Sequence, residues 1–450
     1  MNKSIHGAAE KTSTGFGIQN AWFLVFALAF AYLLSFMDRM VITLMAEAIK
    51  RDLGLSDTQL GLLMGFSFAM FYSVFGLPIG RLADRANRKY IIITGIIVWS
   101  VATALCGFAQ GFWLLFVARV VVGAGEAALN PAALSMIADK FPQQKRGVAT
   151  GVFITGGQIG SAIAFTVGGA LVGWLQFKPP IEGVPFVGSV FAWQSVFWMA
   201  GACGLIAIAF LAVTVEPRRG AYDEGGGKNE PVPLREVLRF LIHHKEAHFA
   251  ILLAPALFAH IVFAVVTWAP AFFLREFDWS LETLGPIFGV IILLTGLSSP
   301  AVAGAVVQFL ERRGISDAPL RTFLLFGVPG SVALLAFPHM PNGVVATILL
   351  ALGLFAMTAI LTIPQIALQN STPATMRSQV AAILFLLLNL IGMGAGPVAV
   401  GLLTDYVFRE PAALKWALSL LIALFAPLAI LLCQRGRRGY SALVSVSKEP

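Results

Sequence analysis

Four ionisable side chains stand inside long apolar runs of this 450-residue sequence. Asp38 and Arg39 lie in the first run, and Arg119 and Glu126 lie seven residues apart in a later one. In a run that crosses a bilayer each such charge costs about 2.5–3.5 kcal/mol, so it persists mainly when it is paired or faces a watery cavity. Two carboxylates beside two arginines could exchange partners while they load and release a proton, and an arginine fork could also hold a carboxylate or a phosphate.

The apolar runs that carry these residues are long enough to be transmembrane helices. Hydrophobic residues make up 58% of the chain and charged residues only 12%, whereas a soluble domain carries about 25% charged residues. A bilayer core takes about 20 apolar residues per helix. The pattern predicts twelve spans, near residues 20–48, 58–80, 90–109, 112–138, 146–175, 191–214, 249–275, 282–310, 320–338, 342–370, 377–407 and 412–433.

The spans fall into two sets of six on either side of a polar stretch. We expect a polar linker that is partly helical after Pro233 and short tails at both ends. The predicted segments are an N-terminal tail 1–19, a first six-helix bundle 20–214, a linker 215–248, a second bundle 249–433 and a C-terminal tail 434–450.

The distribution of basic residues predicts the orientation. With both termini in the cytoplasm, most Lys and Arg fall on the cytoplasmic side, as the positive-inside rule requires. The basic residues left for the outer loops are Lys50, Arg51, Lys178, Arg275, Arg409 and Lys415. The net charge of +8 therefore reflects topology and does not indicate a nucleic-acid partner. We expect a multi-pass protein of the plasma membrane, in a bacterial inner membrane, with cytoplasmic termini.

Depth arithmetic predicts how the four buried charges pair. At about 1.5 Å per residue, Asp38 lies about 15 Å below the outer edge, Arg119 about 10 Å and Glu126 about 21 Å. Arg119 and Glu126 share one helix face because they are seven residues apart. We expect Asp38 to pair with Arg119, and Arg39 or water to satisfy Glu126. These pairs are either static links between helices or carboxyl groups that titrate during a transport cycle.

The two sets of spans carry an internal repeat. Residues Leu60, Gly61, Gly65, Gly80, Arg88 and Lys89 recur 224 positions later as Leu284, Gly285, Gly289, Gly304, Arg312 and Arg313. Gly160 and Gly169 of the fifth span match Gly392 and Gly401 of the eleventh. Glycines are common in spanning helices, but the shared basic pair favours a true repeat. A parallel repeat of this kind predicts a binding cavity between the two halves.

The loop after the second span reads Gly80-Arg81-Leu82-Ala83-Asp84-Arg85-Ala86-Asn87-Arg88-Lys89. It resembles the signature loop between helices 2 and 3 of the major facilitator superfamily, with Asn87 in place of the usual second glycine. The resemblance implies an all-α membrane protein with twelve helices in two pseudo-symmetric six-helix bundles. It also implies that the acid, here Asp84, engages the other half near the start of helix 11. We expect the cytoplasmic gate to comprise Gly80, Asp84, Arg85, Arg88 and Asp139.

Further stretches resemble narrower groups of the superfamily. Arg119 to Ala127 is similar to the helix-4 motif, whose arginine is associated with proton coupling. The fifth span has the glycines of the motif associated with exporters, but Ala164-Phe165 replaces its central Gly-Pro. The stretches 36–39, 55–62, 123–127 and 137–139 resemble the spinster subgroup, whose characterised members move lysolipids and sphingoid lipids.

Other ionisable residues have less specific surroundings. We expect His260 to be a packing histidine, Glu47 to be a solvated interfacial residue, and His243, His244 and His248 to lie on a solvated amphipathic turn that binds no metal. Cys106, Cys203 and Cys433 show no paired spacing, which argues against a disulfide framework or a metal knuckle.

The leading hypothesis is a secondary transporter, not an enzyme, that uses the proton gradient and no cofactor. Its partners are membrane lipids, protons and a small amphiphilic substrate such as a lysolipid or sphingoid lipid, and it works as a monomer. A carrier of organic anions or drugs is the alternative, with Arg39 and Arg119 as anion ligands. A membrane-embedded lipid-modifying enzyme is a third hypothesis, but the loops lack the acidic cluster or nucleophile–base pair that it needs.

Overall fold

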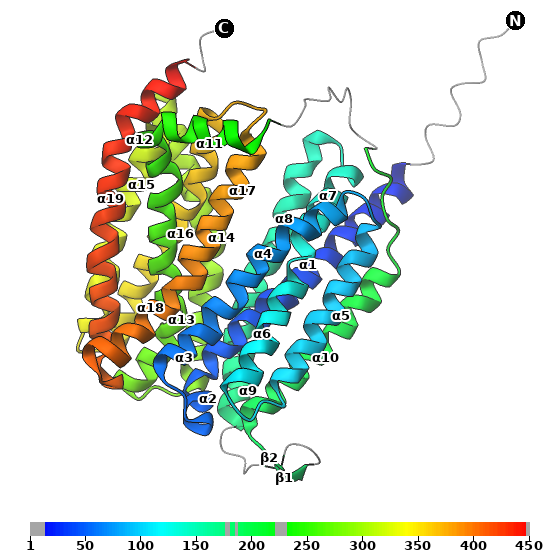
Figure 1. Cartoon of the computed structure of the whole chain (residues 1–450), viewed down its shortest axis with the longest axis vertical. Coiled ribbons are helices and arrows are strands. Elements are labelled where there is room, and N and C mark those ends of the chain that lie inside the picture. The colour runs from blue at the N-terminus through cyan, green and yellow to red at the C-terminus, as the bar shows by residue number, and fades with distance from the viewer. Residues whose placement is uncertain (1–13, 176–180, 185–187, 221–231, 447–450) are drawn as a thin grey trace, which may run out of the picture.

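The computed structural model describes residues 14–175, 181–184, 188–220 and 232–446. Within them, twelve helices are long and apolar enough to cross a membrane, as the hydropathy pattern predicts. Figure 1 shows two helical bundles side by side, the first built from α1 to α10 and the second from α12 to α19. The expected all-α fold is confirmed, with one small β-hairpin added.

The first bundle contains six spans and the hairpin. Its elements are α1 (Thr14–Leu44), α2 (Ala46–Leu53), α3 (Asp57–Gly61), a π-helical turn (Leu62–Phe66), α4 (Ser67–Ala83), α5 (Arg88–Cys106), α6 (Phe112–Glu126), α7 (Leu129–Lys140), α8 (Gln143–Ile163), a π-helical turn (Ala164–Gly168), α9 (Gly169–Leu175), β1 (Ile181–Val184), β2 (Gly188–Val190) and α10 (Ala192–Ala212).

The second bundle follows a short helix of the linker. The elements are α11 (Leu234–His243), α12 (Lys245–His248), a π-helical turn (Phe249–Leu253), α13 (Ala254–Phe277), α14 (Leu281–Arg312), α15 (Ala318–Ala336), a 3-10 turn (Phe337–His339), α16 (Gly343–Ser371), α17 (Arg377–Leu387), a π-helical turn (Leu388–Gly394), α18 (Ala395–Leu402), a π-helical turn (Leu403–Phe408), a 3-10 turn (Pro411–Ala413) and α19 (Leu414–Val446). The expected helix after Pro233 is therefore present as α11.

Short polar caps begin several spans directly after tight loops. The Asn87 side chain accepts from the backbone N–H of Tyr90 at the start of α5. Ser56 and Gln59 form a reciprocal capping box at the start of α3. These caps satisfy backbone donors that have no partner within the helix, so the spans can start abruptly at the membrane boundary.

Two helix ends differ from the hydropathy-based bounds. The first span ends at Leu44 and the chain turns at Met45 into α2, instead of continuing to residue 48. The last helix runs to Val446 rather than ending near residue 433. Its polar extension packs on the protein, because Arg437 donates to Asp317 at 2.7 Å and Tyr440 is fully buried. Polar residues lower hydropathy without ending a helix, which explains the second difference.

The two bundles meet at one end and separate at the other. We call the end that carries α11, the start of α1 and the end of α19 the linker end, and the end that carries β1 and β2 the hairpin end. Figure 1 shows the ribbons of the two bundles converging toward the hairpin end.

Candidate functional site

Arg39 and Glu126 form a buried ion pair between α1 and α6. The Arg39 guanidinium lies 2.7 Å from Glu126 Oε2, and the Ser35 hydroxyl donates to the same oxygen at 2.5 Å. Glu126 is 1% exposed and Arg39 8% exposed. Glu126 is the last residue of α6, where the fourth span bends before α7 begins. The carboxylate therefore sits at a break in its own span.

Three aromatic rings surround the Arg39 guanidinium. Its central carbon lies 4.6 Å from the ring centre of Phe36, 4.5 Å from that of Phe68 and 4.9 Å from that of Tyr72. Cation–π attraction of this kind is strongest where the cation is desolvated. The rings from α1 and α4 therefore stabilise the arginine charge in addition to Glu126.

Asp38 occupies a second polar pocket between α1, α5 and α6. The Thr103 hydroxyl donates to Asp38 Oδ2 at 2.6 Å, and Arg119 Nη1 lies 3.9 Å from the same oxygen. Arg119 is 1% exposed. A separation of 3.9 Å is an ion pair without a hydrogen bond. Asp38 with Arg119 is the pair that the depth arithmetic predicts, and Glu126 has Arg39, one of the two partners expected for it.

Each of the two carboxylates keeps one oxygen free. Among the described residues, Asp38 Oδ1, Glu126 Oε1 and the Nε and Nη1 atoms of Arg119 are buried without a hydrogen-bond partner. A proton can therefore join either carboxylate without breaking a hydrogen bond already made. A buried donor or acceptor without a hydrogen-bond partner is costly. The arrangement can hold and release protons, or take an anion on Arg119.

The residues expected at the cytoplasmic gate lie together at the linker end, all within the first half. Arg88, fully buried at the start of α5, pairs with Asp139 of α7 and donates to Glu216 Oε1 at 3.1 Å. Arg219 donates to the backbone carbonyl of Asp84. The loop is thus tied to α7 and to the start of the linker.

The remaining gate candidates, Gly80, Asp84 and Arg85, are loosely surrounded. Asp84 and Arg85 are exposed to solvent. A Cβ added at Gly80 would meet only Pro131 of the same half, at 3.9 Å. In the described part of the chain the Asp84 carboxylate makes no hydrogen bond or ion pair, so the contact with helix 11 that the family resemblance implies is not made in this conformation. The ribbons of the two halves lie farther apart at the linker end than at the hairpin end (Figure 1).

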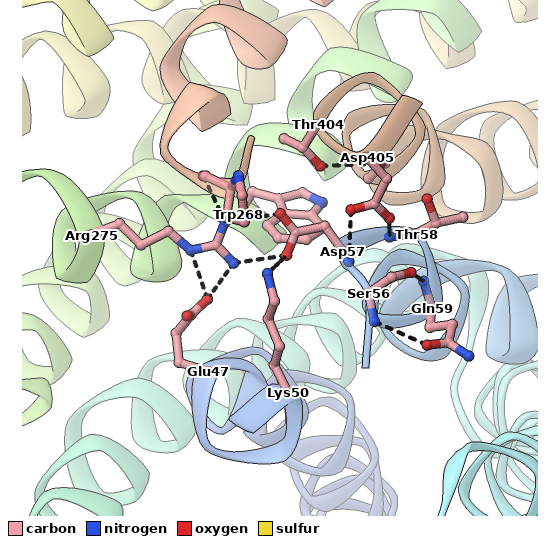
Figure 2. A network of polar contacts seen from close by, with 12 residues as sticks. Glu47, Lys50, Ser56, Asp57, Thr58, Gln59, Trp268, Arg275, Thr404 and Asp405 are labelled. Atoms are coloured by element: carbon pink, nitrogen blue, oxygen red, sulfur yellow. Dashed lines mark hydrogen bonds and ion pairs between the residues drawn. The ribbon is translucent and has the colours of Figure 1, made fainter. Parts of the chain in front are cut away.

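At the hairpin end, Arg275 links the two halves. Figure 2 shows Arg275 of α13 facing Glu47 of α2 and Asp57 of α3. Its guanidinium donates to Glu47 Oε1 at 2.6 and 3.0 Å, and to the two oxygens of Asp57 at 2.9 Å each. Asp57 also accepts from Lys50 at 2.5 Å and is fully buried. We call Glu47, Lys50, Asp57 and Arg275 the hairpin-end network.

A second contact crosses the same interface. The Asp405 carboxylate, beyond α18, accepts from the backbone N–H groups of Asp57 and Thr58 at 3.3 and 2.6 Å (Figure 2). These are the first residues of α3, whose free N–H groups and helix dipole favour an anion. An acid capping a helix of the other half is the contact expected of Asp84. It is present here at the opposite end, between the hairpin-end parts of helices 11 and 2.

Glu47 differs from its expected role. Sequence context predicts a solvated interfacial residue, whereas Glu47 accepts two hydrogen bonds from Arg275 of the other half. The turn at Met45 redirects α2 across the end of the bundle, which brings Glu47 and Lys50 over Asp57. A straight first span would have carried them away from it.

A family model decides the identity of the fold. The model of the Major Facilitator Superfamily matches residues 28–397, which cover most of both bundles. The chain belongs to the major facilitator superfamily. It is therefore an integral multi-pass membrane protein, and its family and fold are those of a transporter.

Relatives within the superfamily have diverse names. The chain is 27% identical over 419 residues to an MFS-type efflux pump of Mycolicibacterium smegmatis, covering 90% of each protein. It is 27% identical over 421 residues to the hexuronate transporter of Bacillus subtilis, covering 91% of this chain and 93% of that one. It is 26% identical over 420 residues to protein spinster homolog 1 of Mus musculus, covering 88% and 75%.

Solved structures share the fold. A bacterial homolog of the human lysosomal transporter spinster, in an inward-facing and unoccupied conformation, aligns with a TM-score of 0.76 and 24% identity, covering 95% of this chain and 97% of that one. The nucleoside transporter NupG aligns with a TM-score of 0.68 and 13% identity, covering 92% and 99%. The expected resemblance to the superfamily and to spinster proteins is confirmed.

The glycines of the internal repeat form the closed interface of this superfamily member. A Cβ added at Gly61 would lie 2.5 Å from the carbonyl oxygen of Pro397, and one at Gly285 would meet the carbonyl oxygen of Phe165. Gly61 corresponds to Gly285 in the 224-residue repeat. Gly169, which contacts Gly285, corresponds to Gly401, which contacts Asp57. The hairpin end is thus closed twice by the same glycine packing, helix 2 on helix 11 and helix 5 on helix 8.

Enlarging one of these glycines is expected to prevent closure of the hairpin end. In Gly285→Val the new side chain collides with the backbone of the π-helical turn at Phe165, and overpacking of this kind costs about 1–3 kcal/mol. The closed population should fall roughly 10- to 100-fold. Cross-linking between Arg51→Cys and Glu410→Cys, both exposed at this end, measures closure. Gly111→Val, at an extended position with open space, should cross-link like the parent; equal rates in all three proteins would contradict the prediction.

The histidines differ in their surroundings. His260 Nδ1 donates to the carbonyl of Ile391 at 2.8 Å and its ring packs on Phe425, as expected of a packing histidine.

The linker histidines were expected on a solvated amphipathic turn. His243 is exposed, but His248 is 3% exposed and packs on Phe240, so His248 lies on the buried face of that turn. α12 starts the seventh span directly at Lys245, so His248 already faces the bundle. His243 and His244 line a cavity of about 1150 Å³ at the linker end, whose lining includes none of the four buried charges.

The hairpin-end network is the part of the site that sequence reasoning missed. One signal was available. Positive-inside topology leaves few basic residues outside, so each outer arginine or lysine calls for a partner. Four of the basic residues predicted to lie outside have one: Lys50 pairs with Asp57, Arg51 with Asp52, Arg275 with Glu47 and Asp57, and Lys415 with Glu276 at 2.6 Å.

Proposed function

We propose that this superfamily member is a proton-coupled secondary transporter that moves an amphiphilic, lipid-like substrate, such as a lysolipid or sphingoid lipid, by alternating access. The observation that carries the proposal is the pair of buried carboxylates, Asp38 and Glu126, each next to an arginine and each with one unpartnered oxygen. Buried ionisable residues within a membrane are characteristic of ion and proton pathways.

In the proposed cycle a proton binds Glu126 at Oε1. Ser35 and Arg39 keep their hydrogen bonds to Oε2, but the neutral carboxyl no longer balances the charge of Arg39. The aromatic rings of Phe36, Phe68 and Tyr72 hold that charge in place. Arg39 then becomes free to take an anionic headgroup, or the bundle rearranges to supply another counter-ion. Release of the proton restores the pair.

Alternating access rests on the asymmetric interface. We propose that the termini are cytoplasmic, in the plasma membrane and in a bacterial inner membrane, so that the hairpin end is external. The structure is then an inward-facing state, closed outside by the hairpin-end network and the repeat glycines. In the other state we expect Asp84 to cap helix 11 at the cytoplasmic end, while Arg88 and Asp139 hold the loop.

An amphiphilic substrate is supported by two features. The sequence has 36 phenylalanines and 6 tyrosines, and the rings nearest the buried charges are Phe36, Phe68 and Tyr72. Aromatic rings around a charged centre suit a molecule with a polar head and an apolar body. The resemblance to the spinster subgroup supports the same class. The proposed unit is a monomer that needs no cofactor and works with protons and membrane lipids.

A carrier of organic anions is the second candidate. Arg119 Nη1 lies 3.9 Å from Asp38, and neither Nε nor Nη1 of Arg119 makes a hydrogen bond in the described part of the chain. Relatives are named hexuronate transporter and probable L-galactonate transporter. A substrate carboxylate that binds Arg119 would accept a charge-assisted hydrogen bond from Nε. This candidate shares the proton-coupling residues and differs in what Arg119 holds.

Transport in proteoliposomes separates the two candidates. The purified protein is reconstituted, an inward-directed pH gradient is imposed, and uptake of a labelled lysolipid is compared with that of a labelled hexuronate. The proposal predicts lysolipid movement that collapses when the gradient is dissipated and is not inhibited by hexuronate. Hexuronate uptake without lysolipid movement would establish the second candidate instead, and movement of either that ignores the gradient would reject proton coupling.

A further inference from the structure

The linker helix α11 lies across the ends of the spanning helices. Figure 1 shows it lying across the linker end of the second bundle and not along the spanning helices. Only His244 separates α11 from α12, which begins the seventh span. The helix therefore sits at the level where that span leaves the membrane, on the second half of the transporter.

One face of α11 is held by the protein. Val237 and Leu241 are buried, and Gln379 at the start of α17 donates to the carbonyl of Val232, just before the helix, at 2.7 Å. These contacts fix α11 on the second bundle, so its other faces have a defined orientation.

A second apolar face of α11 has no protein cover. Leu234, Leu238 and Ile242, spaced four residues apart, are 57%, 45% and 70% exposed. At 100° per residue they form one stripe that adjoins the buried face. Three large aliphatic side chains in a row at the membrane boundary are typical of a helix that lies in the lipid interface.

Two arginines border this stripe on the side away from the protein. Arg235 and Arg239 follow Leu234 and Leu238 directly, and both are exposed. Neither makes an ion pair with a described carboxylate. Around the circumference of α11, the face that contacts the protein is followed by the apolar stripe, and the stripe is followed by the two arginines. This order matches a bilayer surface, where acyl chains lie beneath anionic phosphates.

We propose that α11 is an interfacial helix that binds anionic lipid, with Leu234, Leu238 and Ile242 among the acyl chains and Arg235 and Arg239 on lipid phosphates. This inference is independent of the transported substrate. Because α11 joins the two halves and is fixed to only one, lipid bound there anchors the linker on the membrane surface. Attraction to an anionic leaflet contributes about five-fold in binding per arginine.

The test uses the full-length protein in vesicles. A bimane fluorophore is attached at Ile242→Cys, in a protein whose Cys106 and Cys433 are buried and unreactive and whose Cys203 is replaced by Ser. Quenching by brominated phosphatidylglycerol is compared with quenching by brominated phosphatidylcholine. The expected result is strong quenching by both, with a preference for the anionic lipid that falls at least five-fold in Arg235→Gln/Arg239→Gln.

Arg312→Gln/Arg313→Gln is the matched control, because it removes two exposed charges at the same end of the molecule and should leave the preference unchanged. Absence of quenching by either lipid would place the stripe against water or another protein and overturn the proposal. Equal quenching by the two lipids, unchanged in the Arg235→Gln/Arg239→Gln variant, would also overturn it, because the arginines would then play no part.

Discussion

Glu126→Gln is expected to abolish uptake driven by a pH gradient while leaving substrate exchange at zero gradient intact. With one proton per substrate, a gradient of one pH unit supports roughly ten-fold accumulation. The variant should therefore accumulate substrate to a ratio of about one. The physical reason is that glutamine keeps the acceptor for Ser35 and Arg39 but cannot take up or release a proton.

Retained substrate exchange at zero gradient would distinguish loss of proton coupling from simple misfolding. Removing one partner of a buried ion pair costs about 3–5 kcal/mol, and here the three rings around Arg39 offset part of that cost. The measurement is the ratio of gradient-driven uptake to counterflow of the same labelled substrate. Asp38→Asn should behave in the same way. Glu276→Gln, which breaks the half-exposed pair with Lys415, is the control and should leave both activities unchanged.

A Glu126→Gln protein that still concentrated substrate under a pH gradient would show that the Arg39–Glu126 pair is a static link between α1 and α6. A protein that lost uptake and exchange together would show instead that Glu126 is needed for substrate binding or for the conformational change. Only loss of accumulation with retained exchange supports the proposed role.

The central charges could be predicted from sequence because a charge inside an apolar run is a strong local signal. Asp38 and Arg39 interrupt the first span, and the spacing of Arg119 and Glu126 places both on one helix face. Depth along a helix follows from a fixed rise per residue, so Asp38 could be paired with Arg119 without coordinates, whereas the partner of Glu126 remained Arg39 or water. Twelve spans and two halves followed from the same regularities of hydropathy and charge.

The hairpin-end network could not be predicted, for reasons of position and distance. Glu47, Asp57 and Arg275 lie near the ends of spans, where charged residues are ordinary. The contact from Arg275 to Asp57 joins residues 218 positions apart, and that from Asp405 to Thr58 joins residues 347 apart. No local periodicity encodes such pairs. The turn at Met45 brings Glu47 into the network, and no glycine or proline in the adjacent sequence predicts that turn.

The family resemblance predicted a contact between an acid and a helix N-terminus at the linker end, but in this conformation a contact of that kind is made at the hairpin end. An acid on a helix N-terminus was expected at Asp84, and the structure has that contact at Asp405. A transporter that alternates between two closed ends needs contacts at each end that cannot all form together. The sequence motif names only the linker-end set, and the conformation decides which of the two sets is made.

The hairpin-end network leads to the second large prediction. Arg275→Gln removes the four hydrogen bonds that join α13 to Glu47 and Asp57. Asp57 keeps Lys50 at 2.5 Å, and Glu47 is partly exposed, so each half stays folded. The closed hairpin end should lose about 1.5–3 kcal/mol, less than for a fully buried pair. The ratio of closed to open molecules should therefore fall roughly 10- to 100-fold.

Distances between spin labels at Arg51→Cys and Glu410→Cys measure this ratio by pulsed electron resonance. Asp405→Asn, which keeps one acceptor oxygen for the start of α3, should have a smaller effect, because a charge at a helix N-terminus contributes about 0.3–1 kcal/mol. Lys415→Gln breaks an ion pair at the same end but within the second half, and should leave the distance distribution unchanged. If Arg275→Gln and Lys415→Gln gave the same distribution, the glycine packing of helix 2 on helix 11 and of helix 5 on helix 8 would close the hairpin end without help from charge. A shift confined to Arg275→Gln would show that one arginine of the second half sets how often the transporter opens at that end.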